Sequence, residues 1–266
     1  MKRNIIILLA VIFLSTACEE EVVLDLKSIE KKLIVEATLT DELPAVRVLL
    51  SYSQDFYDIP EYEPIIQASV ELSDEDGEMT ILVPDSAGFF NSGNLVPRNG
   101  EKYTLHINVD DYSFNVSSLL PEKVKTESVS FVPNPFAGSP DSLNAFVNVQ
   151  NPKAQESFFR LFLSKIGVPF TREFYMLDNT LSDNGVVTMP VYYKVFAPGD
   201  TMVLEIRHLN RETYTYYSGL NENISGSFNS IAPGNPNTNM PDDIYGFFAG
   251  YSITRDTVIV GGRFPY

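Results

Sequence analysis

The sequence predicts an all-β fold made of two consecutive β-sandwich-like domains, the first of them immunoglobulin-like, with one short helix in the second. Short segments in which apolar and polar residues alternate follow one another closely, as half-buried strands do. Turns rich in Gly, Asp and Pro separate these segments. Because only one later stretch carries helix start signals, the strands are expected to pair into sandwiches.

The N-terminal segment, MKRNIIILLAVIFLSTACEEE, has the pattern of an export signal. Lys2 and Arg3 form a basic start, and Ile5–Leu14 is an unbroken apolar run. This run has the length of a signal-peptide core and is too short to cross a bilayer core of roughly 30 Å as a helix. Residues 1–17 are therefore expected to be a lipoprotein signal peptide.

Cys18 is the only cysteine of the chain and follows the small residues Ser15 to Ala17, an arrangement that resembles a bacterial lipobox. Ser15 departs from that pattern, since Leu is commonest there. The alternative is an ordinary secreted protein cut after Ala17, but a free thiol in an oxidising compartment argues against it. Cys18 is thus expected to carry the lipid anchor, palmitate included, because two or three acyl chains hold a protein firmly to a membrane.

Glu19-Glu20-Glu21 resemble the acidic export signals that carry some lipoproteins to the outer face of the outer membrane. We therefore expect a lipid-anchored protein of the outer membrane that faces the cell exterior, with residues 18–31 as an acidic tether. Loss of Lys2 and Arg3 with the signal peptide lowers the formal net charge from −16 to −18. So acidic a chain disfavours nucleic acid as a partner. A single cysteine allows no disulfide within the chain, and no cofactor is expected.

Residues 32–120 are predicted to form the first sandwich. Strands are expected at Lys32–Thr40, Ala45–Tyr52, Ile65–Ser73, Glu78–Pro84, Lys102–Val109 and Tyr112–Ser118. Asp74–Gly77 is predicted to be a hairpin turn, because Asp-Gly between two strands is a strong hairpin signal. A calcium loop is the alternative at this position, but the ligand spacing of an EF-hand is absent.

Residues 121–266 are predicted to form a second β-rich domain, since Pro121 cannot continue a strand ladder. Its strands are expected at Val124–Val132, Leu143–Gln150, Phe158–Ile166, Thr171–Leu177, Val186–Phe196, Thr201–Leu209, Tyr245–Ser252 and Thr257–Val260. A helix is expected from Asn210, its N-cap, to about Leu220 or Asn221.

Two further expectations concern packing in this domain. Tyr214, Tyr216 and Tyr217 of the helix are expected to be packing residues, because Tyr214 and Tyr217 share one helix face, which a single helix must bury against a sheet. Tyr245–Tyr251 is apolar on both faces and should lie centrally in the second sandwich. The Asn-rich coil before it, from Pro233 to Pro241, should be held to the fold by asparagine side chains.

The segments LIVEATLTDELPAVRVLLSYS, ASVELSDEDG, NGEKYTLHINV, ETYTYYSGL and APGNPNTNM...IYGFFAGYS resemble the family known as domain of unknown function 4249 (DUF4249). The resemblance covers nearly all of the chain after the signal segment. It implies an outer-membrane lipoprotein, often encoded beside a TonB-dependent receptor, and it implies no reaction.

Catalytic and metal-binding motifs are weak in this sequence. His106 and His208 lie in predicted strands, no Ser stands in a Gly-x-Ser-x-Gly elbow, and no His or Cys cluster has metal-ligand spacing. A Ser-His-Asp site assembled in three dimensions and a pair of glycosidase carboxylates stay open. We expect no enzyme activity, no catalytic residue and no metal site.

A loop with the sequence SQDFYDIPEYE is the best candidate for a binding surface. Phe56, Tyr57 and Tyr62 place large aromatic side chains where a hairpin needs only turn residues. The alternative is that they cover the open end of the first core. The predicted role is that of a binding accessory to a TonB-dependent receptor in nutrient uptake, with a small-molecule, glycan or peptide ligand. Rival functions are a surface hydrolase with a dispersed active site and a structural envelope protein or adhesin.

Four tripeptides read Asp, then a hydroxyl residue, then an apolar residue. They are Asp85-Ser86-Ala87, Asp141-Ser142-Leu143, Asp200-Thr201-Met202 and Asp256-Thr257-Val258. They resemble acceptors of general bacterial O-glycosylation. The alternative is that Asp ends a turn before a strand and gives the same tripeptide for folding reasons.

Overall fold

The computed structural model describes residues 30–54, 64–134, 136, 143–150, 156–170, 175–179, 182–183, 185–225 and 234–261. The predicted signal peptide, Cys18, Glu19-Glu20-Glu21 and the loop residues Phe56, Tyr57 and Tyr62 lie outside these ranges, as does most of the predicted tether. All elements given below belong to one compact unit, residues 32–53 and 60–266.

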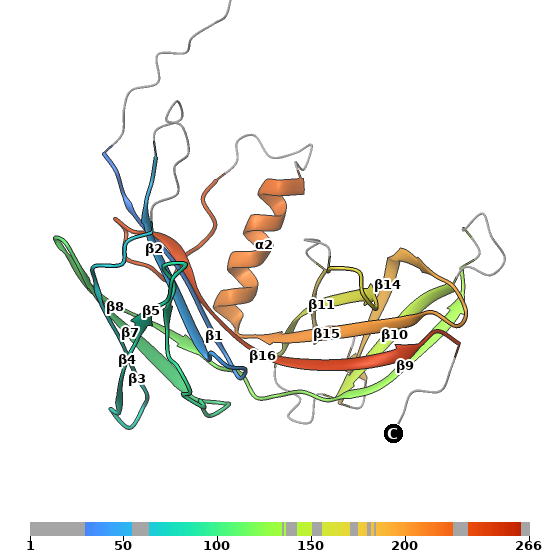
Figure 1. Ribbon diagram of the computed structural model, residues 1–266. Helices are drawn as coiled ribbons and strands as arrows, with labels where there is room; N and C mark the ends of the chain where they lie inside the picture. The colour runs from blue at the N-terminus through green and yellow to red at the C-terminus, as the bar shows by residue number, and fades with distance from the viewer. Residues whose placement is uncertain are drawn as a thin grey trace, which may run out of the picture. The chain divides into compact units, whose positions relative to one another are not determined.

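The described strands form three sheets, and the all-β, sandwich-like prediction is confirmed (Figure 1). The long sheet has eight strands, in the order β12 (Met176–Asp178), β11 (Phe158–Lys165), β15 (Thr201–Leu209), β16 (Tyr245–Ile259), β1 (Leu33–Thr40), β2 (Val46–Tyr52), β6 (Phe90–Asn91) and β5 (Val83–Pro84). A second sheet has the order β4 (Met79–Ile81), β3 (Ser69–Ser73), β7 (Lys102–Val109) and β8 (Tyr112–Leu119). The third has the order β13 (Ser182–Asp183), β14 (Val186–Phe196), β10 (Leu143–Gln150) and β9 (Thr126–Pro133).

Two main apolar cores lie in this arrangement. The first joins strands β1 and β2 to β3, β7 and β8, with Leu39, Leu50, Leu105 and Ile107 fully buried. The second joins β11 and β15 to β10 and β14, with Phe159, Val147 and Met189 among its members. The long sheet contains strands from both sides of residue 120. The domain boundary expected at 120/121 stays a prediction.

Strand β16 differs most from the expectation. Two separate strands were expected, whereas one strand runs from Tyr245 to Ile259 and pairs antiparallel with β15 and parallel with β1. Its burial on both faces is confirmed: Phe248 belongs to the first core, and Phe247 lies on the opposite face. The strand is central, as predicted, but the prediction that it belongs to the second sandwich alone is wrong, because it also pairs with β1. The alternation of residues within one segment does not indicate such a distant partner.

The coil before β16 is held by Asn239, as predicted for its asparagines. The Asn239 amide exchanges two hydrogen bonds with the backbone of Phe248 and donates a third to the Ser117 carbonyl. Gly246, just inside β16, has a φ of +110°, and a Cβ there would collide with the Val35 carbonyl. Glycine is therefore required where β16 approaches β1.

The helix in the described residues, α2 (Arg211–Ser225), begins as predicted and ends later. The Asn210 side-chain oxygen accepts from the Thr213 N–H at 2.7 Å, which is an N-cap bond. Tyr214 stacks on Phe158 of β11 at 4.6 Å between ring centroids, so its predicted packing role is confirmed. Figure 1 shows α2 beside the long sheet, where it contacts β16 and β11.

Several boundaries shift from those expected. Strand β3 begins at Ser69 rather than Ile65, and the expected strand Glu78–Pro84 divides between two sheets. The division falls at Leu82, which is buried and whose N–H donates to the Val70 carbonyl. The Asp74–Gly77 turn is confirmed, since the Gly77 N–H donates to the Asp74 carbonyl at 3.3 Å.

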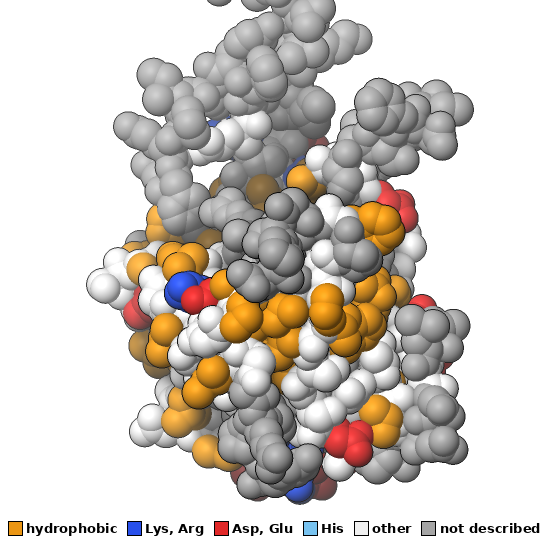
Figure 2. Space-filling model, turned by 90° about the vertical axis from the view of Figure 1, so that its right-hand side faces the viewer, with side chains coloured by type: hydrophobic (Ala, Val, Ile, Leu, Met, Phe, Trp, Pro, Cys, Tyr) orange, Lys and Arg blue, Asp and Glu red, His pale blue; other side chains and the backbone are white. Residues whose placement is uncertain are grey.

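Apolar and charged side chains occupy different areas of the surface seen in Figure 2. Figure 2 shows a face on which apolar side chains cover a broad central area, with the charged side chains mostly at its margin. Within the described residues, no helix combines the length and the apolar character needed to span a membrane.

Candidate functional site

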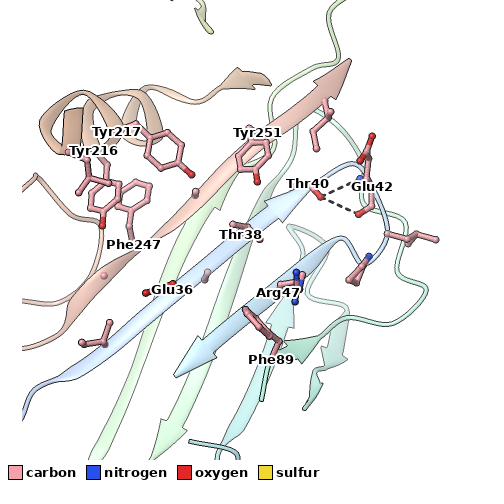
Figure 3. A pocket seen from close by; sticks show the side chains of 18 residues that line it. Glu36, Thr38, Thr40, Glu42, Arg47, Phe89, Tyr216, Tyr217, Phe247 and Tyr251 are labelled. Carbon is pink, nitrogen blue, oxygen red and sulfur yellow. Dashed lines mark hydrogen bonds between the residues drawn. The ribbon is translucent and has the colours of Figure 1, made fainter. Parts of the chain in front are cut away.

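A cleft of about 750 Å³ lies between α2 and the long sheet (Figure 3). That volume is in the range of small-molecule sites. Its lining comes from β1, β2 and β16, from α2, and from two short connections. The lining residues are Ile34, Glu36, Ala37, Thr38, Thr40, Glu42, Leu43, Pro44, Arg47, Phe89, Tyr216, Tyr217, Leu220, Gly246, Phe247, Ala249, Tyr251 and Ile253.

The alternation of β1 explains the floor of the cleft. Leu33, Val35 and Leu39 point into the first core, so the residues between them face the cleft. Glu36, Thr38 and Thr40 therefore give the floor a polar surface (Figure 3).

The hollow itself follows from small residues on the adjacent strand. Ala249 of β16 lies opposite Thr38 in the parallel register, and Gly246 lies further along the same strand. The short side chain of Ala249 leaves space between larger groups on either side, whereas Gly246 lets the β16 backbone approach β1 closely.

Aromatic side chains form the wall on the α2 side. Tyr216 stacks on Phe247 with 4.2 Å between ring centroids and 9° between planes. Burial, with a smaller contribution from Glu36, raises the pKa of Tyr216, and burial raises the pKa of Tyr217 to about 12. Both hydroxyls therefore stay protonated and can donate hydrogen bonds at neutral pH.

Arg47 and Phe89 form the opposite wall. The Arg47 guanidinium lies 4.0 Å from the Phe89 ring centroid, which is a cation–π contact. Phe89 is placed by Asp85, whose Oδ1 accepts from the backbone N–H groups of Ala87 and Phe89 and whose Oδ2 accepts from Asn91. Desolvation acts to raise the pKa of Asp85, but these hydrogen bonds and the charge of Arg47 outweigh it and lower that pKa.

Glu42 at the edge of the cleft belongs to a charge cluster. It pairs with Arg255, whose Nε also donates to Glu205 at 2.7 Å. Glu205 is 2% exposed and accepts a further bond from Arg207 at 2.8 Å. Because a buried carboxylate is stable only when paired, this cluster has a structural role.

Arginines and aromatic rings alternate behind the cleft. Arg160 lies 5.1 Å from the Tyr217 ring and 4.7 Å from the Phe162 ring. Arg207 lies 4.6 Å from Phe162 and 4.8 Å from Tyr251. This alternation connects β11, β15 and β16 to α2 and so fixes the position of the aromatic wall.

His208 lines a second cleft, of about 620 Å³, together with Ser157, Glu156 and Glu212. Its Nδ1 is 2.7 Å from the Glu122 carbonyl, and burial lowers its pKa. A neutral His208 therefore donates from Nδ1 to that carbonyl. In a Ser-His-Asp site, the carboxylate of an acid accepts this Nδ1–H bond and orients the imidazole. For His208, a backbone carbonyl accepts the bond instead.

His106 lies outside both clefts, on the outer face of the second sheet. Its Nε2 is 2.9 Å from Ser73 Oγ, and its Nδ1 is 2.8 Å from Asn115 Oδ1. The three residues come from the neighbouring strands β3, β7 and β8. They form a row of cross-strand hydrogen bonds, which is an ordinary way to stabilise a sheet.

The Arg98 guanidinium lies beside the carboxylates of the Asp74–Gly77 turn, where the alternative prediction placed a calcium ion. It lies 2.8 Å from Asp76, 3.5 Å from Asp74 and 3.2 Å from Glu101. Among the described residues, no group of three or more His, Cys, Asp or Glu side chains could hold a metal ion.

The cleft residues were not among the predicted binding residues. The available signal was the polar face of Glu36, Thr38 and Thr40 on a strand whose other face is fully apolar. Tyr216 was treated only as packing material, and the structure gives it a second place in the cleft wall. Phe56, Tyr57 and Tyr62 lie outside the described residues, and their role as binding residues stays a prediction.

These features define an all-β, sandwich-like protein with a cleft between its helix and its longest sheet. The chain belongs to the family described as Domain of unknown function (DUF4249), whose model matches residues 19–257. A comparison with curated proteins gave no match.

Proposed function

We propose that the protein is a ligand-binding lipoprotein, anchored to the outer membrane through Cys18, exposed at the cell surface and acting as an accessory to a TonB-dependent receptor in nutrient uptake. The anchor and its location rest on the sequence of residues 1–21. The binding role is supported by one structural observation, the cleft between α2 and the long sheet. It combines a polar floor with aromatic walls, as ligand sites do.

The anchor is tested with Cys18→Ala. Loss of the acyl chains should release the protein from the membrane fraction, and labelled palmitate should mark only the wild type. A variant that stays with the outer membrane, beside an unlabelled wild type, contradicts the anchor. Protease shaving of intact cells tests surface exposure, and Ala in place of Glu19, Glu20 and Glu21 should give protection from the protease.

The receptor role is tested by purification from solubilised membranes. The wild-type protein should retain a TonB-dependent receptor that mass spectrometry identifies. Retention of host or matrix glycans instead would favour an adhesin.

The role of the cleft is tested by filling it. Thr38→Trp should place an indole over Ala249 and block the floor, while Thr80→Trp on β4, outside the cleft, is the matched control. Loss of receptor-dependent nutrient uptake in the first variant alone supports the proposal. Equal uptake in both variants would contradict it.

A further inference from the structure

The charged side chains that line the cleft do not form salt bridges with one another within the described residues. Among the described residues, Glu36, Glu42 and Arg47 are the charged side chains that line it. Glu42 is paired with Arg255. Within the described part of the chain, no salt bridge joins Glu36 or Arg47 to an opposite charge; the Arg47 guanidinium lies over the Phe89 ring, and its charge acts on Asp85 at longer range. One negative and one positive side chain therefore line the cleft without a direct salt bridge within the described residues.

The register of β1 and β2 fixes the spacing of these two charges. Thr38 lies opposite Arg47, and Glu36 lies opposite Leu49, so Glu36 and Arg47 are diagonal neighbours on the same face. Diagonal neighbours on paired strands are about 7–8 Å apart. Figure 3 shows Glu36 on the floor and Arg47 in the wall beside Phe89.

The groups between and around the charges are suited to an extended backbone. The Thr38 hydroxyl and the protonated Tyr216 hydroxyl offer hydrogen-bond donors and acceptors. The paired rings of Tyr216 and Phe247 offer an apolar surface. At about 3.3 Å per extended residue, a peptide of about two residues spans the roughly 7–8 Å between these two strand positions.

We propose that the cleft binds short peptides with free termini, the peptide ammonium at Glu36 and the peptide carboxylate at Arg47. This inference rests on the proposed function, since it names the ligand class of the same cleft. An uncharged glycan would desolvate Glu36 and Arg47 without giving either a partner, which is unfavourable. A zwitterionic peptide supplies both partners, and Arg presents the fork geometry that fits a carboxylate.

The test uses full-length purified protein and a pool of short casein peptides. Equilibrium dialysis followed by mass spectrometry measures retention of the untreated pool, of the pool acetylated at its amines and of the pool esterified at its carboxylates. Acetylation should weaken binding to the wild type about fivefold or more and leave binding to Glu36→Gln nearly unchanged. Esterification should behave in the same way with Arg47→Gln.

Glu127→Gln on β9 and Lys102→Gln on β7 are controls matched in charge and outside the cleft. They should respond to both treatments as the wild type does. Thermal melts should coincide for all four variants, because each substituted side chain is exposed.

A charge exchange gives an independent check. Glu36→Arg or Arg47→Glu alone should abolish retention of the peptides. The double variant should recover part of it, because a zwitterion can bind in the reversed direction. Failure of the double variant to recover would overturn the proposed polarity.

The remaining outcomes separate the ligand class from the binding role. If acetylated and free peptides bind the wild type equally, or if only an uncharged malto-oligosaccharide pool is retained, the peptide proposal fails and the cleft remains a binding site. If neither pool is retained and Thr38→Trp leaves nutrient uptake unchanged, both proposals fail.

Discussion

Asn239 binds the backbone of Phe248 on both sides of its amide: Oδ1 accepts from the Phe248 N–H, and Nδ2 donates to the Phe248 carbonyl, each at 3.0 Å. These bonds lie on the edge of β16 that pairs with β15 in its later residues. The pairing with β15 ends at Leu209 opposite Tyr251, so it does not reach Phe248. A side chain therefore continues the ladder that a strand no longer provides.

We predict that Asn239→Ala destabilises the protein by about 1–3 kcal/mol, because it leaves backbone groups of a buried strand without partners. Asn237→Ala, at an exposed position of the same coil, is the control. Chemical denaturation of both variants measures the difference. Equal midpoints would show that water replaces the side chain at no cost.

Phe247→Ala should cost about 3–5 kcal/mol, as truncation of a buried Phe does. Phe247 is 5% exposed and stacks on Tyr216, so the variant loses burial and the support of α2. Phe136→Ala is a suitable comparison, since Phe136 is 95% exposed and its removal should leave the melting temperature unchanged.

Ala at Phe56, Tyr57 and Tyr62 together should leave folding nearly intact and weaken capture of a receptor or ligand. Thermal melts beside a membrane pull-down decide between the two roles of this loop. A triple variant that melts as early as Phe247→Ala would show that the loop covers the first core and is not a contact surface.

His208 should make stability depend on pH. Burial lowers its pKa in the folded state, so below the unfolded value of about 6.5 the unfolded chain binds more protons than the folded one. Stability should therefore fall as pH decreases from about 7 to about 5. His208→Gln should lose less stability over the same interval, and parallel curves for the two proteins would contradict the assignment.

Glycosylation should follow exposure at the described acceptor positions. Ser86 and Thr257 are exposed, whereas Thr201 is half-buried at the start of β15. We therefore expect glycans on Ser86 and Thr257 before Thr201, and Ser142 lies outside the described residues. An intact mass equal to that of the lipidated chain alone would exclude glycans altogether.

Local patterns were sufficient to predict much of the fold. The alternation of Leu33, Val35 and Leu39 predicted β1, and Asn210 was identified as the N-cap of α2 because capping depends on a few adjacent residues. The pairing of β1 with β16 joins positions such as Ala37 and Phe248, and no local pattern encodes such a partner. The cleft was missed for the same reason, since Glu36 and Tyr216 meet only after β16 has taken its place beside β1.

The parallel pairing of β1 with β16 also has a consequence for the order of folding. Met240, Ile244 and Phe248 belong to the core that is otherwise built from residues 33–120. That core cannot close until almost the whole chain is available, because its last wall is also its most distant one in sequence. Contacts of such long range form slowly. During synthesis the first core would therefore lack one wall until β16 has been made and has paired with β1.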